Sequence, residues 1–364
     1  MKIIFFFLLI STSAYSYTDI VNLNGLGTEM ITMGTGLART GSTGAVYSNP
    51  SLLSDLSKVK KFTSTNVIVS QKENDSSTRT DFKPEVIPLF AGNSKGDGHS
   101  GWAYGLYSVK FRYQSSFSAG SDKSKYEGEF SQLGLLAGYG KKIDDQWSWG
   151  IQIEANRGTS EVSGKSSGSQ SGFSYSGTFE QESSIWSANM GLGTNIKGDN
   201  WSLGASAKMN ILKFGHRESS KSEIKTSTGQ TYKEEFETTK AKIIPRVGIG
   251  AFRRFSFTDC YSDLLFTPRY TDPDTDKQVN PSFTIRNSFE QMPSGSSYVF
   301  YEGIGFTPGT SNANDSKNES FSGSLGVSEK GEHSLGYGGF TYSRDLFSSG
   351  NTQYLLTFGT TFDY

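Results

Sequence analysis

The feature that most constrains this fold is a succession of segments, each roughly ten residues long, in which apolar and polar residues alternate. In residues 147–155 and again in residues 201–211, apolar side chains occupy the odd positions and polar ones the even positions. Period two with one apolar face predicts half-buried β-strands. The composition agrees, because 42 glycines and 13% aromatic residues against only 34% hydrophobic residues favour strands over helices. We therefore expect an all-β fold.

The lengths of the connections indicate which kind of β fold this is. Residues 142–145 and 198–200 are short turns, whereas the Ser/Gly/Lys/Glu-rich stretches 158–182 and 214–240 are expected to be long polar loops. Short turns on one side and long loops on the other are typical of an outer-membrane barrel. The sequence thus predicts a transmembrane antiparallel β-barrel whose apolar faces contact lipid.

The number of strands follows from the alternating segments. About fourteen candidates lie near residues 62, 84, 101, 130, 146, 184, 201, 241, 256, 282, 297, 320, 334 and 352. An even number places both ends of the barrel on one side. The segments near 256 and 282 alternate weakly, so about twelve strands remain an alternative.

The N-terminal residues have the pattern of a secretory signal peptide. A lysine at position 2 precedes the apolar stretch 3–10, and Ala14 and Ser16 flank a suitable cleavage position. We expect residues 1–16 to be removed on export to the cell outer membrane. The one cysteine, Cys260, can form no internal disulfide and lies far from the cleavage position, which excludes lipoprotein attachment there.

The last predicted strand ends on an aromatic residue. Gly359, Phe362 and Tyr364 are spaced like the terminal signal that the outer-membrane assembly machinery binds, so we expect this machinery to be a partner during insertion.

Residues 34–56 read GTGLARTGSTGAVYSNPSLLSDL. This segment resembles the N-terminal hatch of the FadL-like outer-membrane transporters of long-chain fatty acids and aromatic hydrocarbons, in which a Gly-rich segment leads into Asn-Pro-Ala. Asn49 and Pro50 match, and Ser51 stands where the family has alanine. The resemblance implies that residues 17–61 form a plug inside a barrel made by residues 62–364, with Asn49, Pro50 and Ser51 at its gate.

The resemblance also implies passive uptake of a hydrophobic molecule, which leaves sideways through a gap made by a kinked third strand. In the third predicted strand, the apolar residues change phase between 102–106 and 109–113. We expect a β-bulge at Tyr107 and Ser108, which would bend the strand and place the lateral opening there.

Patterns for other chemistry are incomplete. His99, His216 and His333 lack metal-ligand spacing, and the acidic residues 272–276 lack the glycine of a calcium loop. Gly191 and Gly193 lie within a predicted strand, where small residues let a barrel curve or clear its lumen. A formal net charge of −1 argues against nucleic-acid binding. We expect no enzyme activity, cofactor or metal.

The predicted function is uptake of long-chain fatty acids or similar hydrophobic small molecules by a monomer in contact with outer-membrane lipid and lipopolysaccharide. Two alternatives keep the fold. A general porin would pass small polar solutes through an open lumen, and a structural or surface-interaction barrel would transport nothing.

Overall fold

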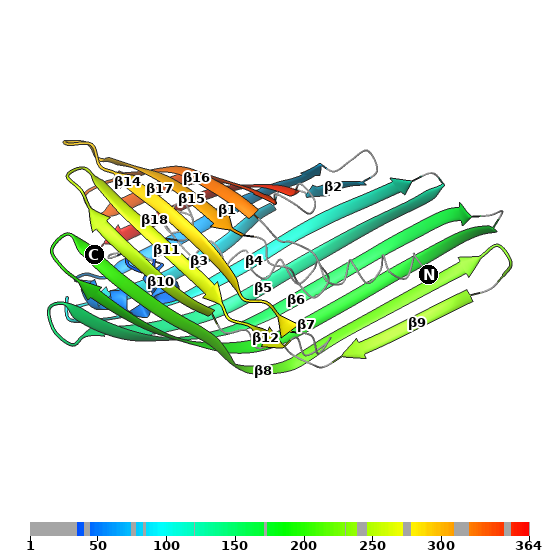
Figure 1. The fold of residues 1–364 in the computed structure, drawn as a ribbon, viewed down its shortest axis with the longest axis horizontal. Helices are drawn as coiled ribbons and strands as arrows, with labels where there is room; N and C mark the ends of the chain where they lie inside the picture. Colours follow the sequence, from blue (N-terminus) through cyan, green and yellow to red (C-terminus); the bar gives the residue numbers. More distant parts are fainter. Residues whose placement is uncertain are drawn as a thin grey trace.

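The computed structural model describes residues 35–39, 44–73, 78–82, 85–119, 121–170, 173–229, 231–238, 246–271, 278–308, 320–345 and 351–363. Within these ranges the chain forms a closed antiparallel barrel of fourteen strands, which confirms the predicted fold class. The elements, drawn in Figure 1, are α3 (Ala45–Ser48), η3 (Pro50–Asp55), β1 (Lys60–Glu73), β2 (Thr78–Phe82), β3 (Glu85–Gly96), β4 (Ser100–Ala119), β5 (Asp122–Lys142), β6 (Trp147–Gln170), β7 (Phe173–Lys197), β8 (Trp201–Thr226), β9 (Thr231–Thr238), β10 (Arg246–Arg254), β11 (Thr258–Thr267), β12 (Tyr270–Thr271), β13 (Gln278–Val279), β14 (Ser282–Gln291), β15 (Tyr298–Thr307), β16 (Ser320–Lys330), β17 (Ser334–Asp345) and β18 (Asn351–Asp363).

The barrel closes where β1 pairs with β18. β2 and β3 both pair with β1 and β4, so the two segments together form one barrel strand. β9 and β10 likewise both pair with β8. β11 and β14, where the alternation is weak, pair with each other along their whole lengths, which favours fourteen strands over twelve. β12 and β13 form a separate two-stranded sheet.

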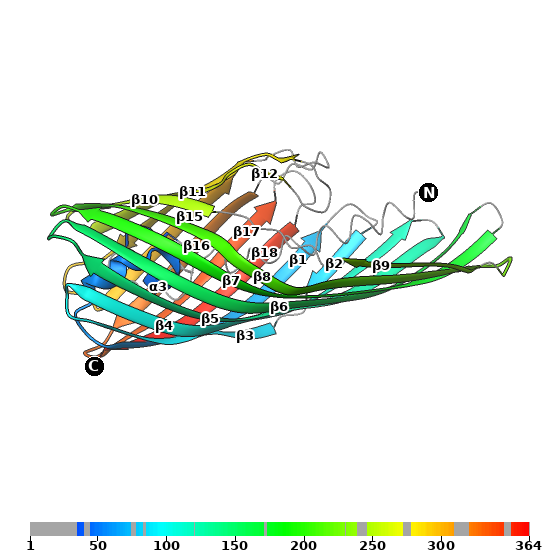
Figure 2. The same cartoon turned by 90° about the horizontal axis from the view of Figure 1, so that it is seen from below.

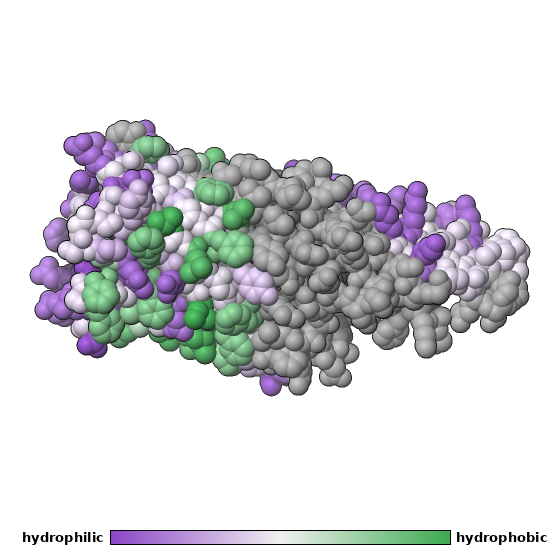
Figure 3. Space-filling view, turned by 90° about the horizontal axis from the view of Figure 1, so that it is seen from above, coloured by the Kyte–Doolittle hydropathy of each residue, from purple (hydrophilic) through white to green (hydrophobic). Residues whose placement is uncertain are grey.

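The apolar faces of the strands point outward. Trp147, Trp149 and Trp201 are 46%, 40% and 44% exposed, whereas Gln152 and Glu154 on the opposite face of β6 are only 1% and 2% exposed. Figure 3 shows the apolar residues gathered in a band beside the end of the barrel that carries the short turns, here called the short-turn end. This is the pattern of a barrel that contacts lipid outside and polar groups inside. None of the helices in the described ranges is long and apolar enough to cross a membrane.

The stretches predicted as long polar loops, 158–182 and 214–240, are largely strands instead. β6, β7 and β8 contain 24, 25 and 26 residues, whereas β11 and β15 contain 10 each. A membrane-spanning strand needs only about ten residues, so β8 continues for roughly 50 Å beyond the span. Figures 1 and 2 show this extension leaving the end opposite the short turns. The outer face of this extension is polar, so the apolar alternation of residues 147–155 does not continue into it.

We call this extension the projecting sheet: residues 122–131, 159–170, 173–184 and 217–226, with β9. In the projecting sheet the outer face is polar, and apolar residues occur on the inner face instead. Glu161 and Glu180 are exposed on the outer face, while Val162 and Phe179 on the inner face are only 3% and 4% exposed. The residues of β5 and β6 still pair one for one throughout. The apolar face therefore changes without a slip in the backbone, because the surroundings of the outer face change.

The β-bulge predicted at Tyr107 and Ser108 is not found against β5. β4 pairs with β5 from Ser100 to Ala119 with no shift of register, so β4 has no β-bulge against β5 at Tyr107 or Ser108. A change of apolar phase, which suggested the bulge, also occurs in β6 without one.

Both ends of the sequence lie partly outside the described residues. Gly359 and Phe362 are part of β18, and Phe362 is exposed on the outer face, 41% accessible. The signal peptide, residues 1–16, and Tyr364 of the assembly signal fall outside the described ranges.

Candidate functional site

Two segments that precede the first strand, residues 35–39 and 44–56, lie inside the barrel at the short-turn end. We call them the plug. η3 contacts β4, β5, β6 and β7, and almost every plug residue is buried. The local sequence explains the shape of this part of the plug. Pro50 occupies the first turn of η3, where its missing N–H costs nothing, and the side chain of Asn49 caps the turn by accepting from the Ser51 N–H.

Asn49 is the polar centre of the plug. Its Nδ2 donates to the carbonyl of Leu37 at 2.7 Å and to the carbonyl of Thr194 on β7 at 3.1 Å. Its Oδ1 accepts from the backbone N–H of Ser51 at 3.2 Å and from the Ser51 hydroxyl at 2.7 Å. One side chain, 0% exposed, thus joins both plug segments to the wall.

A row of wall glycines makes room for the plug. Five of them pair in sequence across neighbouring strands: Gly96, Gly101, Gly140, Gly150 and Gly193. A Cβ atom at any one of them would overlap an atom of the plug, the Asn49 amide in the case of Gly193. The absence of side chains at this level of the wall therefore leaves the space that the plug occupies. The prediction that the glycines at 191 and 193 clear the lumen is confirmed, since a Cβ at Gly191 would overlap Gln152.

A second set of contacts fixes the first plug segment to the wall strands β11, β14 and β15. Arg39 forms an ion pair with Glu290 of β14, and its guanidinium lies 5.1 Å from the ring centroid of Tyr261 and 5.5 Å from that of Tyr301. Asp263 of β11 accepts the backbone N–H groups of two neighbouring plug residues at 2.8 and 3.2 Å. Each charge that the plug brings into the lumen is thus matched by a wall group.

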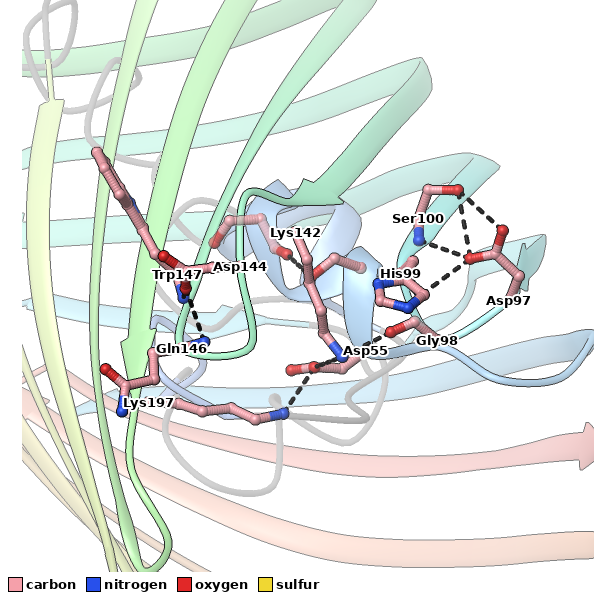
Figure 4. Close-up of polar contacts among 12 residues, drawn as sticks. Asp55, Asp97, Gly98, His99, Ser100, Lys142, Asp144, Gln146, Trp147 and Lys197 are labelled. Atoms are coloured by element: carbon pink, nitrogen blue, oxygen red, sulfur yellow. Dashed lines mark hydrogen bonds and ion pairs between the residues drawn. The ribbon is translucent and has the colours of Figure 1, made fainter.

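Ion pairs of Asp55 hold the C-terminal end of η3 at the short-turn end of the barrel. Figure 4 shows Asp55 between Lys142 and Lys197, whose Nζ atoms lie 3.3 and 2.8 Å from the Asp55 Oδ1. In the adjacent turn, Asp97 accepts the backbone N–H groups of Ser100 at 2.6 Å and of His99 at 2.9 Å. These two bonds stabilise the ionised form and hold the pKa of the Asp97 carboxyl below its usual value.

A buried polar network lies on the other side of the plug, around Glu154 of β6. Its carboxylate accepts from the hydroxyl of Tyr107 on β4 and, at 3.2 Å, from the amide of Asn156. The Nζ of Lys208 on β8 lies 3.6 Å from the second carboxylate oxygen and 3.4 Å from the ring centroid of Tyr47 in the plug. The network therefore reaches from the plug to β4.

Tyr107 is also the place where the pairing of the wall changes. β3 pairs with β4 from Gly96 opposite Gly101 up to Phe90 opposite Tyr107. Among the described residues, 85–88 pair with β1 and have no partner on β4, and pairing with β4 resumes with β2.

The irregularity lies in β3. Its register against β1 shifts so that Leu89 is the extra residue, and the neighbouring Pro88 has no N–H to donate. A proline inside a predicted strand was the sequence signal for this break.

The structure brings most of the predicted site residues into two places. Asn49, Pro50 and Ser51 lie together where the plug meets the glycine row, all buried. Tyr107 is 2% exposed at the end of the β3–β4 pairing, and Ser108 follows it, half-buried.

Sequence reasoning missed the charged residues that fix the plug, which are Arg39, Asp55, Lys142, Glu154, Lys197, Lys208, Asp263 and Glu290. Within the described ranges there is no group of acidic, histidine or cysteine side chains that could hold a metal ion. The acidic residues 272–276 lie outside those ranges.

Solved structures with the same fold are hydrophobic-compound transporters. The P. putida toluene transporter TodX matches with a TM-score of 0.73 and 11% identity, covering 94% of this chain and 99% of its own. The Ralstonia pickettii toluene transporter TbuX matches with a TM-score of 0.72 and 12% identity, covering 95% and 100%. A Pseudomonas aeruginosa FadL homologue matches with a TM-score of 0.64 and 10% identity, covering 91% and 96%. The chain thus has the fold expected from the resemblance at residues 34–56.

Comparison by sequence adds nothing to this. No protein-family model matches the chain. No curated protein matches it either.

Proposed function

We propose that this protein is an outer-membrane channel for the passive uptake of hydrophobic small molecules, such as long-chain fatty acids or aromatic hydrocarbons. The single observation that carries the proposal is a plug docked inside the barrel beside a wall in which 85–88 lack partners on β4. The shared fold with toluene and fatty-acid transporter structures supports the same function.

The polarity of the lumen supports a sideways exit. Around the plug the inner wall includes buried polar and charged side chains such as Gln152, Glu154 and Asn156, all at most 7% exposed. An apolar molecule gains nothing by entering such a region, because it would have to displace satisfied hydrogen bonds and ion pairs. In our proposal the molecule instead leaves between β3 and β4 near Tyr107 and Ser108, and Asn49, Pro50 and Ser51 gate the route.

The location and partners follow from this function. The exposed apolar band would contact outer-membrane lipid, the short-turn end would face the periplasm, and the projecting sheet would rise among the lipopolysaccharide. We further propose that the protein works as a monomer, that its final strand is bound by the assembly machinery during insertion, and that it carries out no enzyme reaction.

The test is to measure ion conductance in planar bilayers together with cellular uptake of labelled oleate and labelled toluene. Uptake of either compound with little steady conductance supports the proposal. Large steady conductance without uptake of either compound would show a general porin for polar solutes.

One observation favours the second alternative, a surface-interaction barrel. The projecting sheet exposes alternating acidic and basic side chains on its outer face, such as Glu161 and Lys165, which is more suited to a macromolecular partner than to an apolar solute. If neither uptake nor conductance is found, this reading replaces the transporter.

A further inference from the structure

Lys208 is one of the charged wall residues that contact the plug. Besides Glu154 and the Tyr47 ring, its Nζ contacts Gln152, whose carbonyl oxygen accepts from it at 3.0 Å when the amide is oriented to satisfy its neighbours. In that orientation the Gln152 nitrogen donates to the carbonyls of Val46 at 2.8 Å and Tyr47 at 3.0 Å. The ammonium group therefore has a contact with a plug ring and another with a side chain that the plug backbone orients.

Glu154 of β6 connects Lys208 to Tyr107 of β4. It is 2% exposed, and a buried carboxylate of this kind requires a counter-charge and hydrogen-bond donors. Those partners are Lys208 on one side and Tyr107 on the other. Gln132 of β5 also donates to the Tyr107 hydroxyl at 3.2 Å. Tyr107 is the residue of β4 at which pairing with β3 ends.

We propose that Tyr47, Lys208, Glu154 and Tyr107 form a latch that couples the position of the plug to the opening in the wall. The inference rests on the proposed function, in which these two parts move. When the plug shifts, Lys208 loses the Tyr47 ring and the ordered Gln152, and the charge of Glu154 is less well compensated. A buried carboxylate without its counter-charge takes up a proton, and the neutral carboxyl is a weaker acceptor. The bond that holds the Tyr107 ring at the end of the β3–β4 pairing is then weakened. Lys208 and Glu154 act here as positioning residues.

Coupling of this kind is reciprocal, so it can be tested from either end. Hydrogen exchange of the purified protein reports the plug through a peptide covering residues 44–49 and the wall through one covering 101–108. We expect Lys208→Met to speed exchange at least about tenfold in both peptides, the second of which contains Tyr107, the hydroxyl donor to Glu154. Lys208→Arg, which keeps the charge, is expected to restore slow exchange in the wall peptide.

Lys197→Met is the matched control, because it removes a lysine that also pairs with a carboxylate at the plug but has no contact with Glu154 or Tyr107. It should loosen residues 50–56 and leave the wall peptide unchanged. If Lys208→Met loosens the plug and the wall peptide keeps its wild-type exchange rate, the contacts only anchor the plug and the latch is refuted.

Tyr107→Phe tests the same claim from the wall and serves if Lys208→Met does not insert. Loss of the hydroxyl should speed exchange of the plug peptide, and the double variant with Lys208→Met should add less than the sum of the two. An unchanged plug peptide overturns the latch. The wild-type uptake of oleate and toluene is measured in parallel, so that absent uptake counts against the proposed function while the exchange data alone decide the latch.

Discussion

At the scale of single residues, the seat of the plug depends on the absence of side chains in the wall. We expect Gly193→Ala to displace Asn49, because the new Cβ would overlap its amide oxygen. Overpacking of this kind costs about 1–3 kcal/mol, here in docking of the plug rather than in stability of the barrel. Gly336→Ala is the control, since a Cβ there meets open space. Steady ion conductance should rise only in the first variant; equal conductance in both would contradict this role of the glycine row.

Asn49 gives a second prediction at this scale. Asn49→Ala leaves the buried carbonyls of Leu37 and Thr194 without their donor, which costs about 1–3 kcal/mol. We expect exchange of the amides in η3 to accelerate by about tenfold or more, at 1.4 kcal/mol per tenfold. Ser51→Ala removes one hydroxyl donor and leaves those two carbonyls satisfied, so its effect should be small. If both variants exchanged alike, the Asn49 bonds would not hold the plug.

The sequence predicted the apolar and turn-forming part of this site and missed its charges. Asn49 and Pro50 belong to the local segment that resembles the FadL-like hatch, so that resemblance was enough to single them out. Glu154 and Lys208 both stand on the polar faces of alternating segments, but they come from β6 and β8. Whether two such charges meet depends on how the strands are registered, which the sequence alone does not give.

At the scale of elements, the break in β3 is the feature to test. Deleting Leu89 and replacing Pro88 with Val removes the extra residue and restores an N–H, so residues 85–88 can pair with β4. We expect the barrel to insert normally and uptake of labelled oleate and toluene to fall at least about tenfold. Pro88→Val alone keeps the extra residue and should retain most of the uptake. Full uptake in the deletion variant would exclude an exit between β3 and β4.

The strands were predictable from the sequence wherever apolar and polar residues alternate. All fourteen segments are strands, including the weak ones near 256 and 282, because alternation marks a face that contacts an apolar phase. β6, β7 and β8 run far beyond their predicted ends, since Glu161 and Ser163 lie on a face that meets no lipid. Strand pairing there is made by backbone bonds, which any residue type can form, so a polar outer face gives no sign of the strand in the sequence.

At the scale of the whole molecule, the barrel should not depend on the central part of the projecting sheet, which β6 and β7 form. Replacing residues 161–182 with an Asn-Gly turn joins β6 and β7 just above the cross-strand pair of Ser160 and Ser183, and keeps Arg157 beside Trp186, whose ring centroid lies 5.4 Å from the guanidinium. The pairing within the apolar band is untouched. We therefore expect the shortened protein to insert and to unfold within about 5 °C of the full chain, measured by heat-dependent mobility in gels.

Uptake by this shortened protein distinguishes the roles of the two parts. If the route runs from the lumen to the opening between β3 and β4, uptake of labelled toluene should continue, because the plug, Tyr107 and the unpaired residues 85–88 are all retained. The measurement compares the initial rate at low toluene concentration with that of the full chain in the same cells. Loss of uptake in a protein that still inserts and resists unfolding would show instead that the projecting sheet is part of the route, and that the inner face bearing Val162 and Phe179 contacts the solute.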